Sequence, residues 1–263
     1  MLNFSNIRAL ILDLDGVIWK DQLPLGDLSK IFTQIKLLNW QFVFASNNST
    51  YDLEHFLDKF NCFGITLEPW QIIGSAEVTA HYLRQKHPHG GPVYIIGENG
   101  LTQTLNKFGF FHHEQEGLAV VVGLDRQMSY NKLAHATLLI RAGISFIGTN
   151  PDLTYPTPEG QVPGAGAIIA ALEAATNIHP LFMGKPGKAI YQVCLNRLGT
   201  LPSETLAIGD RLETDIIGGQ AMGCPTALVL SGVTTKEQAR KWQPAPDWIG
   251  TDLETLIKQA IQT

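Results

Sequence analysis

Residues 9–18 read Ala9-Leu10-Ile11-Leu12-Asp13-Leu14-Asp15-Gly16-Val17-Ile18. The apolar run that opens this segment is typical of an interior strand of a parallel sheet, which is covered on both faces. Two carboxylates and a glycine follow, at the end of the strand beyond which ligands bind in open α/β sheets. Taken alone, Asp15-Gly16 is equally well explained as an ordinary turn. The segment therefore predicts an interior strand and leaves the role of its acids open.

Composition limits the class of protein. The 263 residues, with 44% hydrophobic residues and a net charge of −5, are enough for one large or two ordinary domains. No block of Lys or Arg predicts nucleic-acid binding, and no run reaches the roughly 18 apolar residues of a membrane span. The first residues lack a signal-peptide pattern, and the three cysteines form no C-x-x-C pair. We expect a cytoplasmic protein with no nucleic-acid or membrane partner.

Strand and helix patterns alternate along the chain, which implies parallel strands joined by crossover helices. The expected strands are residues 10–14, 41–45, 72–74, 93–96, 119–122, 145–147, 206–208 and 227–230, and the expected helices are residues 28–38, 52–60, 101–108, 130–141, 188–198, 214–222 and 253–260. Junctions are placed at Gly74-Ser75, where Ser75 is expected to cap the next helix, and near Pro180. The expected fold is α/β, with a Rossmann-like parallel-sheet core of residues 1–74 and 181–263 and an inserted smaller α/β cap of residues 75–180.

Three further polar clusters follow predicted strands or precede predicted helices. Ser46-Asn47-Asn48-Ser49-Thr50 offers donors for an anion, although a helix-capping loop would explain the same residues. Gly184-Lys185-Pro186-Gly187 carries one lysine, and a lone loop lysine is usually only solvated.

The third cluster adds Asp210 and Asp215 to the two acids of the first strand. Four carboxylates at one sheet edge would repel one another unless a divalent cation offset the charge. Carboxylate oxygens suit Mg²⁺, which is often completed by a substrate phosphate.

Together these motifs resemble the haloacid dehalogenase-like phosphohydrolases, and more narrowly the NagD and p-nitrophenylphosphatase group, which has a large α/β cap. The matching motifs are Asp13-Leu14-Asp15-Gly16-Val17, Ser46-Asn47-Asn48, Gly184-Lys185-Pro186 and Gly209-Asp210 through Thr214-Asp215. The cap segments that resemble the group are Gly97-Glu98-Asn99-Gly100-Leu101, Val121-Val122-Gly123-Leu124-Asp125-Arg126, Thr149-Asn150-Pro151-Asp152 and Pro163-Gly164-Ala165-Gly166. Each motif alone is weak, but four in the family's order form a specific pattern.

The resemblance implies a Mg²⁺-dependent phosphatase that hydrolyses small phosphomonoesters through an aspartyl phosphate. Asp13 would be the nucleophile and Asp15 the general acid and base. Lys185 would neutralise charge on the phosphoryl group during transfer. Mg²⁺ would be bound by the Asp13 carboxylate, the Asp15 carbonyl and Asp210, with Asp215 ordering the metal's surroundings through water.

The same resemblance implies the substrate contacts. Ser46, Asn47 and Asn48 would bind the phosphoryl group together with Lys185, and Asn150, Asp152 and Tyr155 of the cap would contact the leaving group. Sugar phosphates, nucleoside monophosphates, phosphoglycolate and aryl phosphates all remain open as substrates, and caps of this kind can provide a homodimer surface. A non-catalytic module that binds a phosphorylated ligand or Mg²⁺ on the same fold is the alternative.

Overall fold

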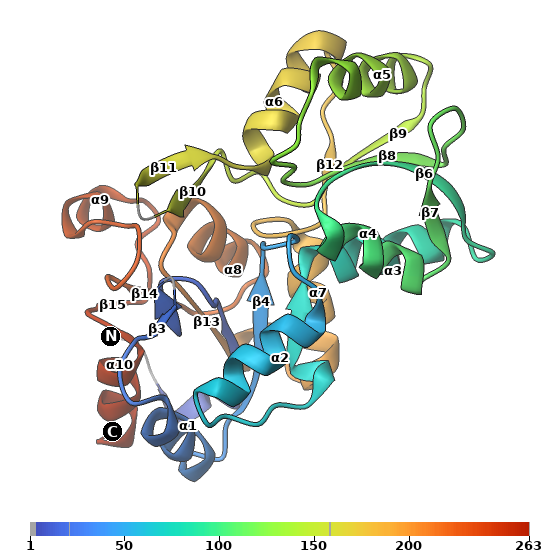
Figure 1. Cartoon of the computed structure of the whole chain (residues 1–263). Coiled ribbons are helices and arrows are strands. Elements are labelled where there is room, and N and C mark those ends of the chain that lie inside the picture. Colours follow the sequence, from blue (N-terminus) through green and yellow to red (C-terminus); the bar gives the residue numbers. More distant parts are fainter. Residues whose placement is uncertain (1–3, 21, 158, 263) are drawn as a thin grey trace. The chain divides into compact units, whose positions relative to one another are not determined.

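The computed structural model describes residues 4–20, 22–157 and 159–262 of the chain (Figure 1). Its contacts divide the chain into two compact units. The first unit contains residues 1–46, 56–73 and 190–263, and the second contains residues 47–55 and 74–189. The loop of residues 47–55 thus groups with the second unit. The assignment of an inserted segment as a substrate-specificity cap stays a prediction.

The first unit is built on a six-stranded sheet with the order β15-β14-β13-β1-β4-β5. Its strands are β1 (Ala9–Leu12), β4 (Gln41–Ser46), β5 (Ile72–Gly74), β13 (Thr205–Gly209), β14 (Thr226–Val229) and β15 (Trp248–Gly250). Strand β1 pairs in parallel with β4 and β13, with Leu12 opposite Phe44 and Ile208. Strand addition changes direction between β1 and β13, so ligands are expected at the carboxyl ends of these two strands.

Amphipathic helices cover this sheet. The helices that lie wholly or mostly in the first unit are α1 (Leu28–Leu37), α2 (Leu53–Cys62), α7 (Lys188–Leu198), the π-helical turn η4 (Leu212–Ile216), α8 (Ile217–Ala221), α9 (Lys236–Lys241) and α10 (Leu253–Ile261), with the 3₁₀ turns η1 (Phe4–Asn6), η2 (Pro69–Gln71) and η3 (Pro202–Glu204) and the hairpin β2 (Trp19–Lys20) and β3 (Leu23–Pro24). Helix α1 shows the pattern clearly, because its buried residues follow a helical period of three to four. The Asp27 side chain caps its N-terminus by accepting from the Lys30 N–H at 3.0 Å.

The second unit has its own five-stranded sheet with the order β12-β9-β8-β6-β7. Its elements are α3 (Ser75–Lys86), β6 (Gly91–Ile96), α4 (Asn99–Lys107), β7 (Phe110–His112), β8 (Ala119–Val122), α5 (Tyr130–Arg141), β9 (Ser145–Gly148), the hairpin β10 (Thr154–Thr157) and β11 (Gly160–Pro163), α6 (Ala165–Thr176) and β12 (Leu181–Phe182). All neighbouring strands of the five-stranded sheet are parallel. Here the change of direction falls between β6 and β8.

The expected fold class, an α/β protein with a parallel-sheet core and a second, inserted α/β sheet, is confirmed. Several details of the prediction are wrong. The first strand ends at Leu12, two residues early, and the π-helical turn η4 replaces the start of the helix expected at residues 214–222. Gly74, not Ser75, is the N-cap residue of α3. Helix α6 was not predicted, because its small residues give no strong amphipathic pattern.

Two simple properties follow from the described residues. No helix among them combines the length and the apolar character needed to cross a membrane. None of the three cysteines forms a disulfide; Cys62 is exposed, and Cys194 and Cys224 are buried.

Candidate active site

Three carboxylates of the first unit converge where β1 and β13 end. Asp13, Asp210 and Asp215 each offer one oxygen atom, and these atoms lie within 4.8 Å of one another. The Asp13 N–H continues the strand pairing by donating to the Ile208 carbonyl at 2.9 Å, which fixes the end of β1 against β13. Asp13 is half-buried, and the other two acids are buried. The structure thus brings together three of the four predicted metal-binding acids at the point where the sheet changes direction.

Two glycines leave room for the Asp210 side chain. A Cβ on Gly232 would lie 1.9 Å from Asp210 Oδ2, and a Cβ on Gly16 would lie 2.6 Å from the same atom. Gly16 also has a φ of +81°, which L side chains rarely adopt. Asp210 Oδ2 accepts a hydrogen bond from the Val233 N–H at 2.6 Å. The Ser231 hydroxyl donates to the Gly16 carbonyl at 2.6 Å. The loop after β14 therefore supports both the acid and the turn after β1.

The π-helical turn η4 positions Asp215. Its Oδ2 atom accepts from the Arg211 N–H at 3.1 Å, and its own N–H donates to the Arg211 carbonyl at 3.0 Å. The buried Tyr191 hydroxyl donates to the Asp215 carbonyl at 2.9 Å. Burial raises the pKa of Tyr191 well above its usual value, with the Asp215 charge adding to the effect, so the hydroxyl remains a donor.

Asp15 lies in a different environment from the three clustered acids. Its side chain is exposed, and Oδ1 accepts a hydrogen bond from the Trp19 indole N–H at 2.8 Å. The Trp19 ring is buried against Phe60 at a centroid distance of 4.9 Å, with the Lys59 ammonium 4.1 Å from its centroid. The Gly16 N–H donates to the Trp19 carbonyl at 2.7 Å. Asp15-Gly16 does form a turn, as the simpler explanation held, but the turn presents an oriented carboxylate.

The polar loop after β4 does not cap α2. Asp52 takes that position, because its Oδ1 atom accepts from the His55 N–H at 3.1 Å. Asn48 Oδ1 accepts from the Thr50 N–H at 2.9 Å and from the Thr50 hydroxyl at 2.7 Å, which shapes the loop. Ser46, the last residue of β4, is buried. The helix-capping explanation therefore fails for residues 46–50.

Asn47 ties this loop to the lysine loop within the second unit. Its side-chain carbonyl accepts from the Lys185 N–H at 2.7 Å, and its amide donates to the Lys185 carbonyl at 3.0 Å. The same side-chain amide nitrogen also donates to the Asp152 carboxylate at 3.1 Å. Lys185 is only 3% exposed, so the alternative explanation of a solvated loop lysine does not hold. Both amide hydrogens of Asn47 are engaged, which leaves its backbone N–H as the donor for a ligand.

The predicted cap residues differ in their surroundings. Asn150 is buried and donates to the Asn47 carbonyl at 2.7 Å, and its own side-chain oxygen accepts from the Asp152 N–H at 3.1 Å. Asp152 and Tyr155 are half-exposed. Asn150 and Asp152 thus support Asn47, whereas no such contact is found for Tyr155 among the described residues.

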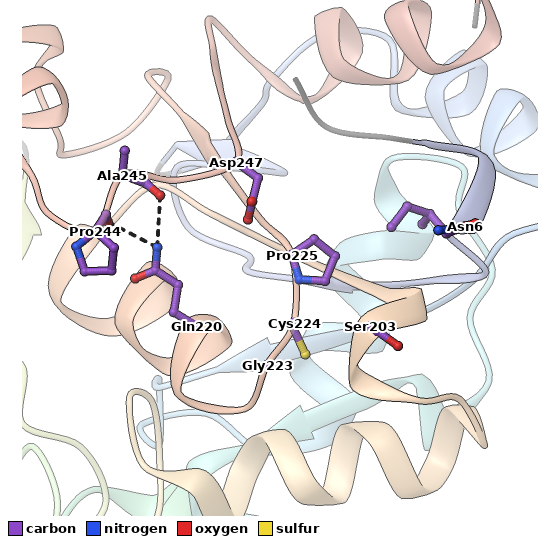
Figure 2. Close-up of a pocket in the computed structure, with 10 residues that line it drawn as sticks. Asn6, Ser203, Gln220, Gly223, Cys224, Pro225, Pro244, Ala245 and Asp247 are labelled. Atoms are coloured by element: carbon purple, nitrogen blue, oxygen red, sulfur yellow. Dashed lines mark hydrogen bonds between the residues drawn. The ribbon is translucent and has the colours of Figure 1, made fainter.

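A separate pocket of about 540 Å³ lies at the opposite edge of the first sheet (Figure 2). Ile7, Ser203 and Pro225 line this pocket, and each lies one or two residues before the first residue of β1, β13 or β14, respectively. The pocket therefore opens at the amino ends of these strands. The Gln220 amide donates to the Pro244 and Ala245 carbonyls at 3.2 Å, as the dashed lines show. This pocket is remote from the acids.

The acid cluster suits a small hard cation. Its donors are carboxylate oxygens, which Mg²⁺ prefers, and a side chain on Gly16 or Gly232 would push into Asp210. Three buried or half-buried like charges at this separation also need a positive charge among them. The donor set therefore fits Mg²⁺.

Comparisons with known proteins agree with this geometry. A family profile described as haloacid dehalogenase-like hydrolase matches residues 10–111, and one described as HAD-hydrolase-like matches residues 182–256. An acid sugar phosphatase of Staphylococcus saprophyticus is 34% identical over 97% of this chain and 98% of its own length. The chain belongs to the haloacid dehalogenase-like hydrolases.

Solved structures of this family show the same fold. A p-nitrophenyl phosphatase from Archaeoglobus fulgidus has a TM-score of 0.91 at 30% identity and covers 96% of this chain and 99% of that one. A glycerol phosphate phosphatase from Mycobacterium tuberculosis, in complex with magnesium, has a TM-score of 0.87 at 31% identity and covers 96% and 77%. The resemblance to the NagD and p-nitrophenylphosphatase group is confirmed, and so is the predicted enzyme class, a phosphatase of this family.

Sequence reasoning missed the residues that support the acids. Trp19 could have been found as the indole donor four residues after Asp15. Ser231-Gly232 follows a buried strand at the carboxyl edge, which is the same signal that marked Asp210. Tyr191 lies inside a helix and carries no such signal.

Proposed function

We propose that this phosphatase is Mg²⁺-dependent and hydrolyses small phosphomonoesters through an aspartyl phosphate on Asp13. The observation that carries the proposal is the convergence of the Asp13, Asp210 and Asp215 oxygens where β1 and β13 end. The magnesium complex of the Mycobacterium tuberculosis glycerol phosphate phosphatase supports the choice of metal.

The chemistry needs two carboxylates with different roles. In the first step an Asp13 oxygen attacks phosphorus, the ester bond breaks, and Asp15 gives its proton to the leaving alcohol. In the second step Asp15 takes a proton from water, the water oxygen attacks phosphorus, and phosphate leaves Asp13. Asp15 suits this exchange because it is exposed to solvent and held by Trp19.

The metal would be held by the Asp13 carboxylate, the Asp15 carbonyl and Asp210, with Asp215 ordering its surroundings. When bound it supplies positive charge that offsets the carboxylates and the phosphoryl oxygens. Val233 and Arg211 hold Asp210 and Asp215 in place through backbone N–H groups, so this support does not depend on mobile side chains.

The phosphoryl group would be bound by the Ser46 hydroxyl and by backbone N–H groups of Asn47 and Asn48. The Asn47 side chain would act indirectly, because it fixes the Lys185 backbone from both sides. Lys185 would stabilise the charge that develops during transfer. Asn47 would thus still donate to the phosphoryl group, but through its backbone N–H.

The substrate would be a small soluble phosphomonoester. The relatives bear the names acid sugar phosphatase, p-nitrophenyl phosphatase and glycerol phosphate phosphatase, which share phosphomonoester hydrolysis. A homodimer stays a prediction from the resemblance, and the cytoplasmic location stays a prediction from the composition of the chain.

The test is phosphate release from a panel of small phosphomonoesters with Mg²⁺, with EDTA, and for Asp13→Asn. We expect Mg²⁺-dependent release that EDTA abolishes and that the folded Asp13→Asn protein lacks. Activity retained in Asp13→Asn would refute the nucleophile assignment. No release from any compound by a folded protein that binds Mg²⁺ would favour the non-catalytic binding module.

A further inference from the structure

The second sheet has a ligand position of its own by topology. Its strand order changes direction between β6 and β8, and ligands of open α/β sheets bind beyond the carboxyl ends of strands at such a point. The two loops that begin there are residues 97–98 after β6 and residues 123–129 after β8. The first loop contributes Glu98 and the second contributes Arg126, and these two side chains form an ion pair.

Glu98 and Arg126 form a held pair that keeps polar atoms available. Glu98 Oε1 accepts from the Arg126 Nε at 2.9 Å and from the Arg126 backbone N–H at 3.0 Å. Among the described residues, no hydrogen bond is made by Glu98 Oε2 or by the two Nη atoms of Arg126. The Arg126 side chain is 55% exposed and that of Glu98 is 23% exposed. The pair therefore offers one acceptor and a pair of donors in fixed relation.

Hydrogen bonds within the loop that carries Arg126 support its conformation. Buried Asp125 accepts from the Gln127 N–H at 2.8 Å and from the Lys132 ammonium at 2.6 Å. Lys132 also donates to the Gln127 carbonyl at 3.2 Å. Since Asp125 and Lys132 offset each other as Glu98 and Arg126 do, the four charges sum to zero.

The pair lies beside the loop proposed to bind the phosphoryl group, within the same unit. The Gly100 N–H, at the start of α4, donates to the Thr50 carbonyl at 3.1 Å, and Glu98 is the N-cap residue of that helix. The Glu98 carboxylate raises the pKa of the Arg126 guanidinium, so the pair stays charged beside this loop.

We propose that Glu98 and Arg126 bind hydroxyl groups of the substrate's leaving group and so favour sugar and polyol phosphates, an inference that rests on the proposed function. A carboxylate oxygen accepts from one hydroxyl while the guanidinium donates to a neighbouring one. A leaving group with a second negative charge gains less, because Glu98 already neutralises Arg126.

The test compares kcat and KM for glucose 6-phosphate, 2-phosphoglycolate and p-nitrophenyl phosphate. The leaving group of p-nitrophenyl phosphate has no further hydroxyl. Arg126→Met and Glu98→Gln are expected to raise KM and lower kcat/KM for glucose 6-phosphate by about tenfold while leaving p-nitrophenyl phosphate hydrolysis unchanged. Lys107→Met is the matched control, because it removes an exposed cation that lies 3.9 Å from Glu54 in the same unit. It should change neither substrate.

Three results would overturn the inference. An equal loss of kcat/KM for glucose 6-phosphate and p-nitrophenyl phosphate would mark a structural role, and no loss for either would leave the pair without a role in binding. A loss for Arg126→Met that is confined to 2-phosphoglycolate would mark recognition of charge. Calorimetric binding of glucose 6-phosphate to Asp13→Asn, with and without Arg126→Met, separates this inference from the proposed function. If the wild type releases no phosphate, the proposed function fails, while weaker binding in the Arg126 variant still supports the pair. Equal binding in both proteins, or none in either, refutes the pair.

Discussion

Replacing Gly232 with alanine perturbs the acid cluster without removing a charge. The added Cβ would lie 1.9 Å from Asp210 Oδ2, whereas an ordinary contact needs roughly 3.5 Å. Asp210 or the loop after β14 must therefore shift by roughly 1.5 Å. Such a shift disturbs the Val233 N–H contact of 2.6 Å and moves a proposed metal ligand. Overpacking of this kind costs about 1–3 kcal/mol of stability.

The expected result is a protein that folds but binds Mg²⁺ about 10- to 100-fold more weakly, as when a residue that supports a metal ligand is lost. The melting temperature should fall by about 2–10 °C, given a chain of this length. Mg²⁺ titrations of phosphatase activity and calorimetric Mg²⁺ binding measure the first effect, and thermal unfolding without Mg²⁺ measures the second.

Gly74→Ala is the matched control, because a Cβ there meets no atom within 4 Å and its φ of −95° is ordinary. It should retain wild-type Mg²⁺ affinity. The reasoning is refuted if Gly232→Ala is folded and binds Mg²⁺ as tightly as the wild type, since Asp210 would then not hold the metal.

Three further predictions concern other parts of the chain. Trp19→Phe keeps the ring packing but loses the hydrogen bond to Asp15, so kcat should fall about tenfold. Trp40→Phe is the control and should leave kcat unchanged. Equal kcat in both variants would show that Trp19 has no role in the site. Iodoacetamide at pH 8 should label only the exposed Cys62, because Cys194 is buried and burial raises the pKa of Cys224 to about 11. Mass spectrometry identifies the labelled cysteine, and rapid labelling of Cys224 would contradict the prediction. Arg126 lowers the pKa of Glu98 below its usual 4.5, so the ion pair stabilises the fold above that pH and its contribution is lost as the pH falls through the folded pKa. Urea unfolding of wild type and Glu98→Gln should therefore differ at neutral pH and converge in acid, and a gap that widens in acid would show the opposite sign.

Local chemistry determined much of this protein. The apolar run before Asp13 can be stable only in a buried strand, and the same argument placed Asp210 at the end of another strand. Because parallel strands end at one edge, their acids could be expected to lie near one another. The polar loop at Ser46 and the lysine at Lys185 also followed from position, although the sequence left their roles open.

Only the tertiary structure decided how these groups are held. No sequence pattern indicates that Gly232 leaves room for the Asp210 side chain, since the two residues are 22 positions apart and come together only on folding. The engagement of the Asn47 amide with Lys185 and Asp152 depends on three separate loops. Likewise, Glu98 and Arg126 are 28 residues apart and pair because β6 and β8 are adjacent strands. Sequence patterns report the local period and the ends of elements, whereas contacts between loops arise from sheet order, which is set by the packing of the whole chain.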